Sequence, residues 1–212
     1  MRPFLLVLSS PSGGGKSTIA RHLFEARDDI GYSVSATTRA PRAGEQDGVA
    51  YHFLSEEEFS RREAAGEFAE TARYGGARYG TLRSEIDRVM GEGRHVVLDI
   101  EVQGARQVRK SFPDAVQVFV VPPSAPALLD RLRARGTEDN AALARRLDHA
   151  AAELEAVPEY DYLVVNDDLV QAVDQVAAIL DAESCRIGRL LEPDAVTRKI
   201  RGDLAALVAK VR

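Results

Sequence analysis

The chain has 212 residues, 45% of them hydrophobic, and a formal net charge of −5 at pH 7. This length and hydrophobic content exclude a disordered or fibrous chain, and the acidic balance argues against nucleic acid or a membrane surface as a partner. Cys185 is the only cysteine, which excludes an internal disulfide and a cysteine-based metal site. We therefore expect a cytoplasmic protein with a local pocket for a small anionic substrate.

A glycine-rich loop follows the first apolar run, at residues 4–8, and precedes a helical pattern that begins at Ile19. This order is typical of a phosphate cradle, because glycines let backbone N–H groups point at an anion and the helix adds its positive N-terminal end. Lys16 can reach the β- and γ-phosphates of a nucleoside triphosphate, and the Ser17 hydroxyl can ligate Mg²⁺. The predicted ATP-binding loop comprises Ser10, Pro11, Ser12, Gly13, Gly14, Gly15, Lys16, Ser17 and Thr18.

The loop departs from the pattern G-x-x-x-x-G-K-[ST] at one position, where Ser10 replaces the first glycine. That position mainly lets the chain turn out of the strand, whereas Gly15, Lys16 and Ser17 bind phosphate and metal. The alternative is a glycine-rich turn with a solvated lysine. The strand before the loop and the helix after it favour the phosphate cradle.

Three further apolar runs, at 96–100, 116–121 and 162–166, are separated by helical stretches. Such spacing predicts an α/β fold in which helices flank a parallel sheet on both faces, as in a P-loop kinase core. The predicted core comprises residues 1–30, 84–123 and 157–183.

Two insertions interrupt this core. Residues 31–83 contain short β-like pieces and a helix at 56–62, which predicts an inserted mixed α/β subdomain, and the stretch 71–81 within it predicts a loop or hairpin that lines a site. Residues 124–156 are helical and arginine-rich, which is the composition of a helical lid. We expect residues 1–212 to form a single folding unit, because no linker or internal repeat divides them.

Phosphoryl transfer depends on positioning and charge neutralisation, and the sequence offers positive groups besides Lys16. Arg39 and Arg42, three residues apart, could bind the phosphate of a second substrate. The lid arginines Arg135 and Arg146 could neutralise the transferring group. For these lid residues, a solvated basic helix face is the open alternative.

Asp99 lies near the end of an apolar run, at the edge where open α/β sheets bind ligands. It could hold Mg²⁺ directly or through water. Glu101 would point the same way if the strand continued that far. An acidic residue at a strand end can also be only a polar terminus.

Five motifs stand in register along the chain. The first is Ser33-Val34-Ser35-Ala36-Thr37-Thr38-Arg39-Ala40-Pro41-Arg42-Ala43-Gly44-Glu45, with Asp47-Gly48 and Tyr51 beyond, which is similar to the GMP-binding segment of the guanylate kinases. The others are Tyr79-Gly80-Thr81, Leu98-Asp99-Ile100-Glu101-Val102-Gln103-Gly104, Arg133-Ala134-Arg135-Gly136-Thr137-Glu138 and Val165-Asn166-Asp167-Asp168. The resemblance covers residues 4 to about 183.

The resemblance implies a P-loop kinase fold with an inserted GMP-binding subdomain and a lid, and reversible transfer of the γ-phosphoryl group of ATP to GMP with Mg²⁺. By the family's pattern, the lid arginines Arg135 and Arg146 close on ATP. With the loop analysis above, we expect catalysis by Lys16, Arg135 and Arg146, ATP binding by the loop and Asn166, and metal binding by Ser17 and Asp99. The GMP-binding residues that the resemblance implies are Arg39, Arg42, Tyr51 and Tyr79 at the phosphate, and Ser35, Glu70, Thr81 and Glu101 at the base. Serine and aspartate are also familiar in that family at the positions of Thr81 and Glu101. Thr81 keeps the hydroxyl and Glu101 keeps the carboxylate.

A carboxylate in the base pocket has a physical reason of its own. Guanine presents adjacent N1–H and N2–H₂ donors that one carboxylate can accept together, whereas adenine presents an acceptor at N1. Composition alone would make Glu70 a solvated residue on an acidic helix at 67–70. The resemblance favours the base-reading role.

The tail, residues 184–212, extends beyond the resemblance. Its apolar residues recur at helical spacing and predict an amphipathic helix. They are Val196, Ile200, Leu204, Val208 and Val211. We expect this helix to pack on the core; a self-association or partner surface is the alternative, and the choice between monomer and homo-oligomer stays open.

Two other functions compete. A kinase of a sugar phosphate could keep the loop and the lid, but Glu70, Thr81 and Glu101 together favour a guanine pocket. A scaffold domain of the guanylate-kinase type binds phosphopeptides and typically lacks an intact phosphate loop, whereas Gly15-Lys16-Ser17 is present here.

Overall fold

The computed structural model describes residues 2–134, 140–190 and 193–211. Its centre is a five-stranded sheet in the order β2-β7-β1-β8-β9. The strands are β2 (Ile30–Tyr32), β7 (His95–Asp99), β1 (Leu5–Ser9), β8 (Val116–Val121) and β9 (Tyr162–Val165). All neighbouring pairs are parallel, which confirms the predicted α/β core. The apolar runs predicted four of these strands and missed the short β2.

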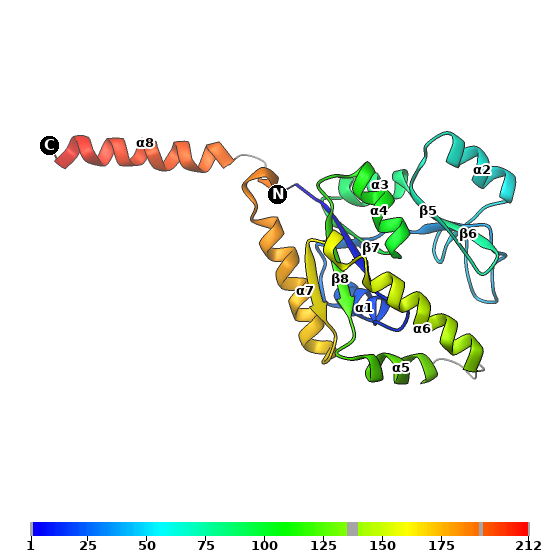
Figure 1. The fold of residues 1–212 in the computed structure, drawn as a ribbon. Helices are drawn as coiled ribbons and strands as arrows, with labels where there is room; N and C mark the ends of the chain where they lie inside the picture. The colour runs from blue at the N-terminus through cyan, green and yellow to red at the C-terminus, as the bar shows by residue number, and fades with distance from the viewer. Residues whose placement is uncertain (1, 135–139, 191–192, 212) are drawn as a thin grey trace.

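Helices cover both faces of this sheet (Figure 1). They are α1 (Lys16–Ala26) and α7 (Leu169–Ser184) on one face, and α3 (Arg83–Gly91) and α4 (Val102–Ser111) on the other. Alternate residues of β1 supply the two cores: Leu6 and Leu8 pack with α1 and α7, whereas Leu5 and Val7 pack with α3 and α4. A strand buried on both sides must be apolar throughout, which is why this segment is a continuous apolar run.

The inserted subdomain contains a second, mixed sheet in the order β4-β3-β6-β5. Its elements are β3 (Ser35–Thr37), β4 (His52–Phe53), α2 (Glu56–Ala64), β5 (Phe68–Tyr74) and β6 (Ala77–Leu82). Phe59 of α2 stacks on Phe68 of β5, with ring centroids 4.4 Å apart, and anchors its small core. The hairpin predicted within 71–81 is present, but the segment around Glu70 is strand β5 and not the acidic helix that its composition allowed.

The lid segment forms two helices, α5 (Ala125–Ala134) and α6 (Asn140–Leu154), followed by the short helix η1 (Val157–Glu159). Leu128 and Leu132 of α5 pack with Ala150 of α6. The helical content of the lid therefore matches the prediction. Arg135 lies outside the described residues.

The tail forms η2 (Ile187–Arg189) and α8 (Pro193–Val211), which confirms the predicted amphipathic helix. The expected packing on the core was wrong, because α8 extends away from the folded body and its apolar side chains are exposed (Figure 1). Helices already fill both apolar cores of the central sheet, which leaves little apolar surface to receive α8, such as the exposed Leu163 and Val165 on the edge strand β9. Within the described ranges, no helix combines the length and apolarity needed to cross a bilayer.

Candidate functional site

The predicted phosphate loop connects β1 to α1 at the carboxyl edge of the parallel sheet. Gly15 caps α1 with a left-handed φ of 101°, and a Cβ there would lie 2.2 Å from Nδ2 of Asn166. Only glycine fits this position, because both the backbone angle and the close approach exclude a side chain. The loop can therefore present its backbone amides and the N-terminus of α1 to an anion.

Two side chains from distant segments hold the loop from behind. Asn166, buried at the end of β9, donates through Nδ2 to the Gly14 carbonyl at 3.0 Å. Arg131 of α5 donates to the Gly14 carbonyl at 3.4 Å and to the Asn166 carbonyl at 2.8 Å. Asn166 thus supports the predicted ATP site through the loop itself. Arg131, not among the predicted site residues, joins the lid to the loop.

Helix α6 contacts the same loop from the other side. Nη2 of Arg146 lies 3.2 Å from Oγ of Ser12, and Oε2 of Glu153 accepts from the Ser12 amide at 3.2 Å. Burial raises the pKa of the Glu153 carboxyl, and His149 opposes this shift, with its Nδ1 3.3 Å from Oε2. A cavity of about 810 Å³ lies between the loop, α6 and Arg73 of β5. Its size and positive lining suit a polyphosphate.

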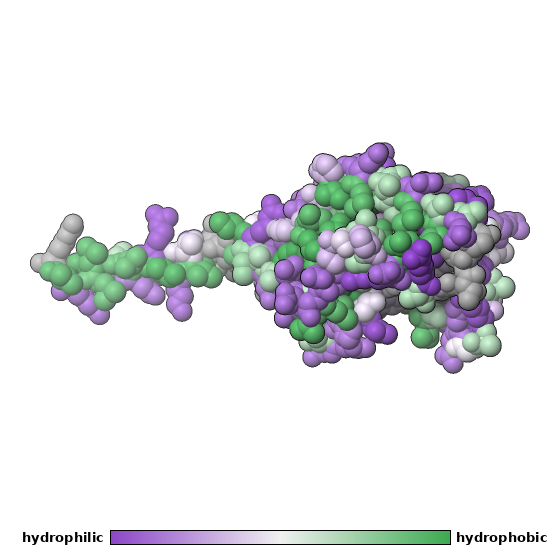
Figure 2. Space-filling model, turned by 60° about the horizontal axis from the view of Figure 1, so that its bottom comes forward, coloured by the Kyte–Doolittle hydropathy of each residue, from purple (hydrophilic) through white to green (hydrophobic). Residues whose placement is uncertain are grey.

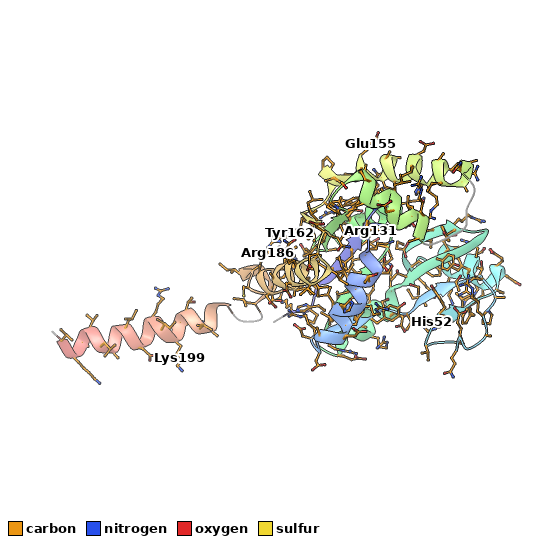
Figure 3. The ribbon with its side chains drawn as sticks, turned by 90° about the horizontal axis from the view of Figure 1, so that it is seen from below. His52, Arg131, Glu155, Tyr162, Arg186 and Lys199 are labelled. Atoms are coloured by element: carbon orange, nitrogen blue, oxygen red, sulfur yellow. The ribbon has the colours of Figure 1, made fainter. Side chains whose placement is uncertain are left out.

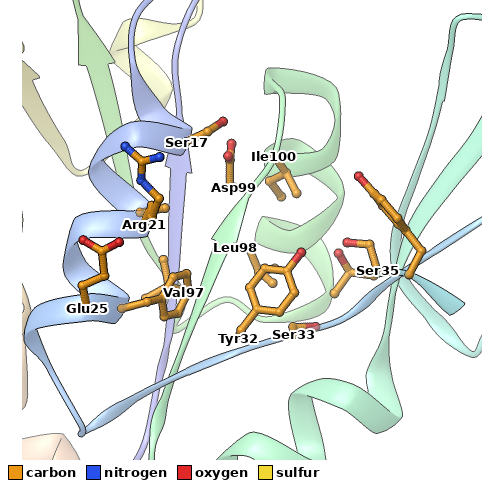
Figure 4. Close-up of a pocket in the computed structure, with 14 residues that line it drawn as sticks. Ser17, Arg21, Glu25, Tyr32, Ser33, Ser35, Val97, Leu98, Asp99 and Ile100 are labelled. Atoms are coloured by element: carbon orange, nitrogen blue, oxygen red, sulfur yellow. The ribbon is translucent and has the colours of Figure 1, made fainter. Parts of the chain in front are cut away.

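Lys16 and Asp99 form an ion pair at the centre of the site, with Nζ 3.3 Å from Oδ1. Asp99 ends β7, and the exposed Ser17 lies beside it in the first turn of α1 (Figure 4). A hydroxyl and a carboxylate are oxygen ligands of the kind that Mg²⁺ prefers. No group of three or more His, Cys, Asp or Glu suited to a metal occurs in the described part of the chain.

A second cavity, of about 420 Å³, opens between α1, β7 and the inserted sheet (Figure 4). Ser35, Tyr51 and Thr81, three of the residues expected at GMP, line it together with Asp99, whereas Glu70 does not. Ser17 lines both this cavity and the one at the loop. The two cavities therefore meet where Ser17, Lys16 and Asp99 lie.

The predicted base-reading residues form a row across three strands. Thr81 on β6 is paired with Ser35 on β3 and with Glu70 on β5. Glu70 is 6% exposed and accepts from Oγ1 of Thr81 at 2.8 Å. On its other side, a Cβ on Gly104 of α4 would lie 2.8 Å from Oε2 of Glu70. Burial raises the pKa of this carboxyl, and the Thr81 hydrogen bond opposes the shift.

Glu101 is not part of this row. Strand β7 ends at Asp99, so Glu101 does not continue its alternation; it is the N-cap of α4, is exposed, and lines the cavity at the loop. The alternation of side chains along a strand would place Asp99 and Glu101 on the same side, but this requires the strand to continue to Glu101. The turn into α4 separates them.

Of the predicted phosphate-binding residues, Tyr51 lines the second cavity, Tyr79 and Arg39 lie beside Tyr51, and Arg42 joins Arg39 through Glu45. The Tyr51 and Tyr79 rings lie 6.0 Å apart, and the Arg39 guanidinium lies 5.4 Å from the Tyr51 ring centroid. Arg39 donates twice to Glu45, at 2.8 and 3.0 Å, and the Arg42 amide donates to the same carboxylate at 2.7 Å. A carboxylate in this position makes the contacts that a phosphate dianion could make.

The site residues that sequence reasoning missed are Arg131, Glu153 and Glu45. Each acts through a contact between segments far apart in sequence or through loop geometry. The spacing of Leu128 and Leu132 is a signal that α5 packs inward, but it does not reveal that Arg131 reaches the loop. Arg135 lies in the part of the lid that is not described, so its predicted role is not placed.

Comparisons with known proteins identify the family. The family model described as guanylate kinase matches residues 2–183. A guanylate kinase of Symbiobacterium thermophilum is 49% identical over 201 residues, covering 91% of this chain and 95% of the relative. A guanylate kinase of Clostridium perfringens strain SM101 is 47% identical over 191 residues, covering 90% of this chain and 88% of the relative.

A solved structure is also similar. The crystal structure of guanylate kinase from Anaplasma phagocytophilum has a TM-score of 0.70 and 35% identity, and the match covers 89% of this chain and 90% of that one. The family model, the relatives and the structural neighbour agree over most of the chain. The chain belongs to the guanylate kinase family.

Proposed function

We propose that the protein transfers the γ-phosphoryl group of ATP to GMP, giving ADP and GDP, and catalyses the reverse reaction. The observation that carries this proposal is the row of Ser35, Thr81 and Glu70, with its buried carboxylate, beside a cavity that meets the phosphate loop. A buried acceptor pair selects the two adjacent donors of guanine. The cost of desolvating the Glu70 carboxylate is offset when the donors of guanine bind to it.

The donor end is formed by the loop. Its amides and the N-terminus of α1 would bind the β- and γ-phosphates, with Lys16 neutralising charge that develops between them. Arg146, already at Ser12 on the same loop, would add positive charge at the γ-phosphate. Arg135 is proposed for the same role from the resemblance alone. An oxygen of the GMP phosphate would attack the γ-phosphorus in line, and the bond to the oxygen bridging the β- and γ-phosphorus atoms would break.

The acceptor end holds GMP. Arg39 and Arg42 would bind its phosphate with the hydroxyls of Tyr51 and Tyr79, and this phosphate would displace Glu45 from Arg39. With the base fixed at Glu70, the phosphate of GMP would point toward the meeting of the two cavities. Positioning of this kind is the main protein contribution to phosphoryl transfer.

The residues present fit Mg²⁺ brought in with the nucleotide. The Ser17 hydroxyl is exposed at the loop, and the Asp99 carboxylate faces it, while the remaining ligands would be phosphate oxygens and water. When bound, the ion supplies charge neutralisation on the phosphates. Asp99 would then release Lys16 from the ion pair toward the phosphates. A cytoplasmic location is proposed with this function, since ATP and GMP are available there.

A coupled assay for ADP formation tests the proposal with GMP, with AMP, with a sugar phosphate and with no acceptor. The expected result is rapid ADP formation with GMP alone. ADP formation that prefers the sugar phosphate would replace the proposal with the sugar-kinase alternative. No ADP formation with any acceptor, together with binding of a phosphopeptide, would favour the scaffold alternative.

A further inference from the structure

Helix α8 carries an apolar stripe that lies outside the family match, which ends at residue 183. Its members are between 50% and 87% exposed, and they form a green band along the helix in Figure 2. They are Val196, Ile200, Leu204, Leu207, Val208 and Val211. Exposed stripes of this length on a soluble chain mark surfaces that bind another helix or protein.

The spacing of the stripe identifies the kind of partner. Ile200, Leu204, Leu207 and Val211 follow one another at intervals of four, three and four residues. This is the alternation of the d and a positions of a heptad, the seam along which two helices pack side by side. Of the flanking positions, g holds Asp203 and Lys210, which have opposite charges, and e holds Arg201 and Val208.

We propose that α8 pairs in antiparallel orientation with α8 of a second copy of this chain. In this register Leu204 lies opposite the partner's Leu207, and Ile200 lies opposite the partner's Val211. Residues in position g then meet across the seam, so Asp203 lies beside the partner's Lys210. Two-fold symmetry repeats this ion pair on the other side, which makes the surface complementary to itself.

The charges favour this orientation over a parallel one. In a parallel pair, a residue in position g meets position e of the partner, five residues further on. Asp203 would then face the partner's Val208, and its charge would lie against an apolar side chain. Arg201, in position e, meets a valine in either orientation, Val208 in the antiparallel pair and Val196 in the parallel one, so it does not discriminate between them. Only the antiparallel pair brings Asp203 and Lys210 together.

The pair would keep the two kinase domains at opposite ends of a two-helix rod. A helix of 19 residues is about 28 Å long, so neither active site would contact the partner. Dimer formation therefore leaves the catalytic constants unchanged. This separates the inference from the proposed function, because the oligomeric state can be measured on protein of any activity.

Sedimentation equilibrium of the full-length protein at low ionic strength tests the proposal. The expected mass is twice the chain mass of 23.1 kDa. Leu204→Asp should raise the dimer Kd by roughly tenfold or more, because it places a charge in the seam. Asp203→Lys and Lys210→Asp should each weaken the dimer, and the double exchange should restore it.

Lys199→Asp is the matched control for Lys210→Asp, since it makes the same charge change in position c, on the outer side of α8. Lys199 lies on the helix clear of the folded body (Figure 3). Lys199→Asp should leave the dimer Kd unchanged. A protein that stays monomeric across the micromolar range overturns the proposal. This holds whether hydrogen exchange shows α8 to be unprotected or shows it to be protected by packing on the core of its own chain. A dimer that Leu204→Asp leaves intact, or a double exchange that fails to restore the dimer, overturns it as well.

Discussion

Replacing Glu70 with glutamine exchanges one acceptor oxygen for a donor amide at a position enclosed on two sides. The carboxylate is held between Oγ1 of Thr81, at 2.8 Å from Oε1, and the backbone of α4 at Gly104. If the glutamine oxygen keeps the Thr81 hydrogen bond, the amide nitrogen replaces Oε2 and points a donor at the donors of guanine. If the amide flips, its NH₂ group can donate to Oγ1 of Thr81, and the single remaining acceptor oxygen faces both donors of guanine.

The magnitude follows from this geometry. A hydrogen bond to a charged group in a buried site is worth about 2 to 3 kcal/mol, which corresponds to a roughly 30- to 150-fold loss in kcat/KM with GMP. AMP gains nothing from the carboxylate, so its kcat/KM should change little and the preference for GMP should shrink by the same factor. ATP binding should be unaffected, because the loop lies outside this pocket.

Steady-state kinetics with GMP and AMP check this prediction in wild type, Glu70→Gln and the control Glu67→Gln. Glu67 directly precedes β5, and its side chain is 43% exposed, so its replacement should be silent. An unchanged ratio of GMP to AMP efficiency in Glu70→Gln would refute the assignment of the guanine pocket to this row of residues.

The same variant has a stability signature. Burial raises the pKa of Glu70 above its ordinary value of 4.5, so the folded wild type binds this proton more tightly than the unfolded chain does. Wild-type stability should therefore fall as pH rises from 4.5 through the raised pKa, a change that the glutamine variant lacks. The Tm of Glu70→Gln relative to wild type should increase with pH. A constant difference would show that this carboxyl is not desolvated.

Lys16→Ala should lower kcat by roughly a thousandfold while GMP binding, measured by calorimetry, persists; near-normal turnover would show that the loop is not the phosphate cradle. Gly15→Ala should abolish ATP binding, because its Cβ would lie 2.2 Å from Nδ2 of Asn166, and retained ATP affinity would contradict the close approach. His95 is buried with a pKa lowered from 6.5, so the unfolded chain binds its proton more tightly and the Tm should fall as pH drops below 6.5. His95→Asn should remove this pH dependence, and an unchanged Tm profile would exclude His95 as its source.

Part of the structure could be predicted from the sequence because it depends on residues that are neighbours in the chain. The phosphate loop is encoded by glycine spacing and by Lys16 and Ser17, because backbone conformation and phosphate contacts there depend on neighbours in the chain. The buried strands are encoded by continuous apolar runs, because helices cover both faces of a parallel sheet. β2 was missed because Ile30, Gly31 and Tyr32 are too few to form such a run. Arg39 and Arg42 were assigned to a second substrate's phosphate from their charge and spacing, the base-reading residues came from the family resemblance, and all of these roles stay predictions.

Tertiary structure decided what depends on contacts between distant segments. Composition made Glu70 an acidic helix residue, yet pairing with β6 places it in a strand, buried beside Thr81. Arg131 and Glu153 reach the loop only because α5 and α6 pack over it. The helical period of α8 was visible in sequence, but its exposure was not, since a pattern fixes which residues share a face and only the fold decides whether that face is covered.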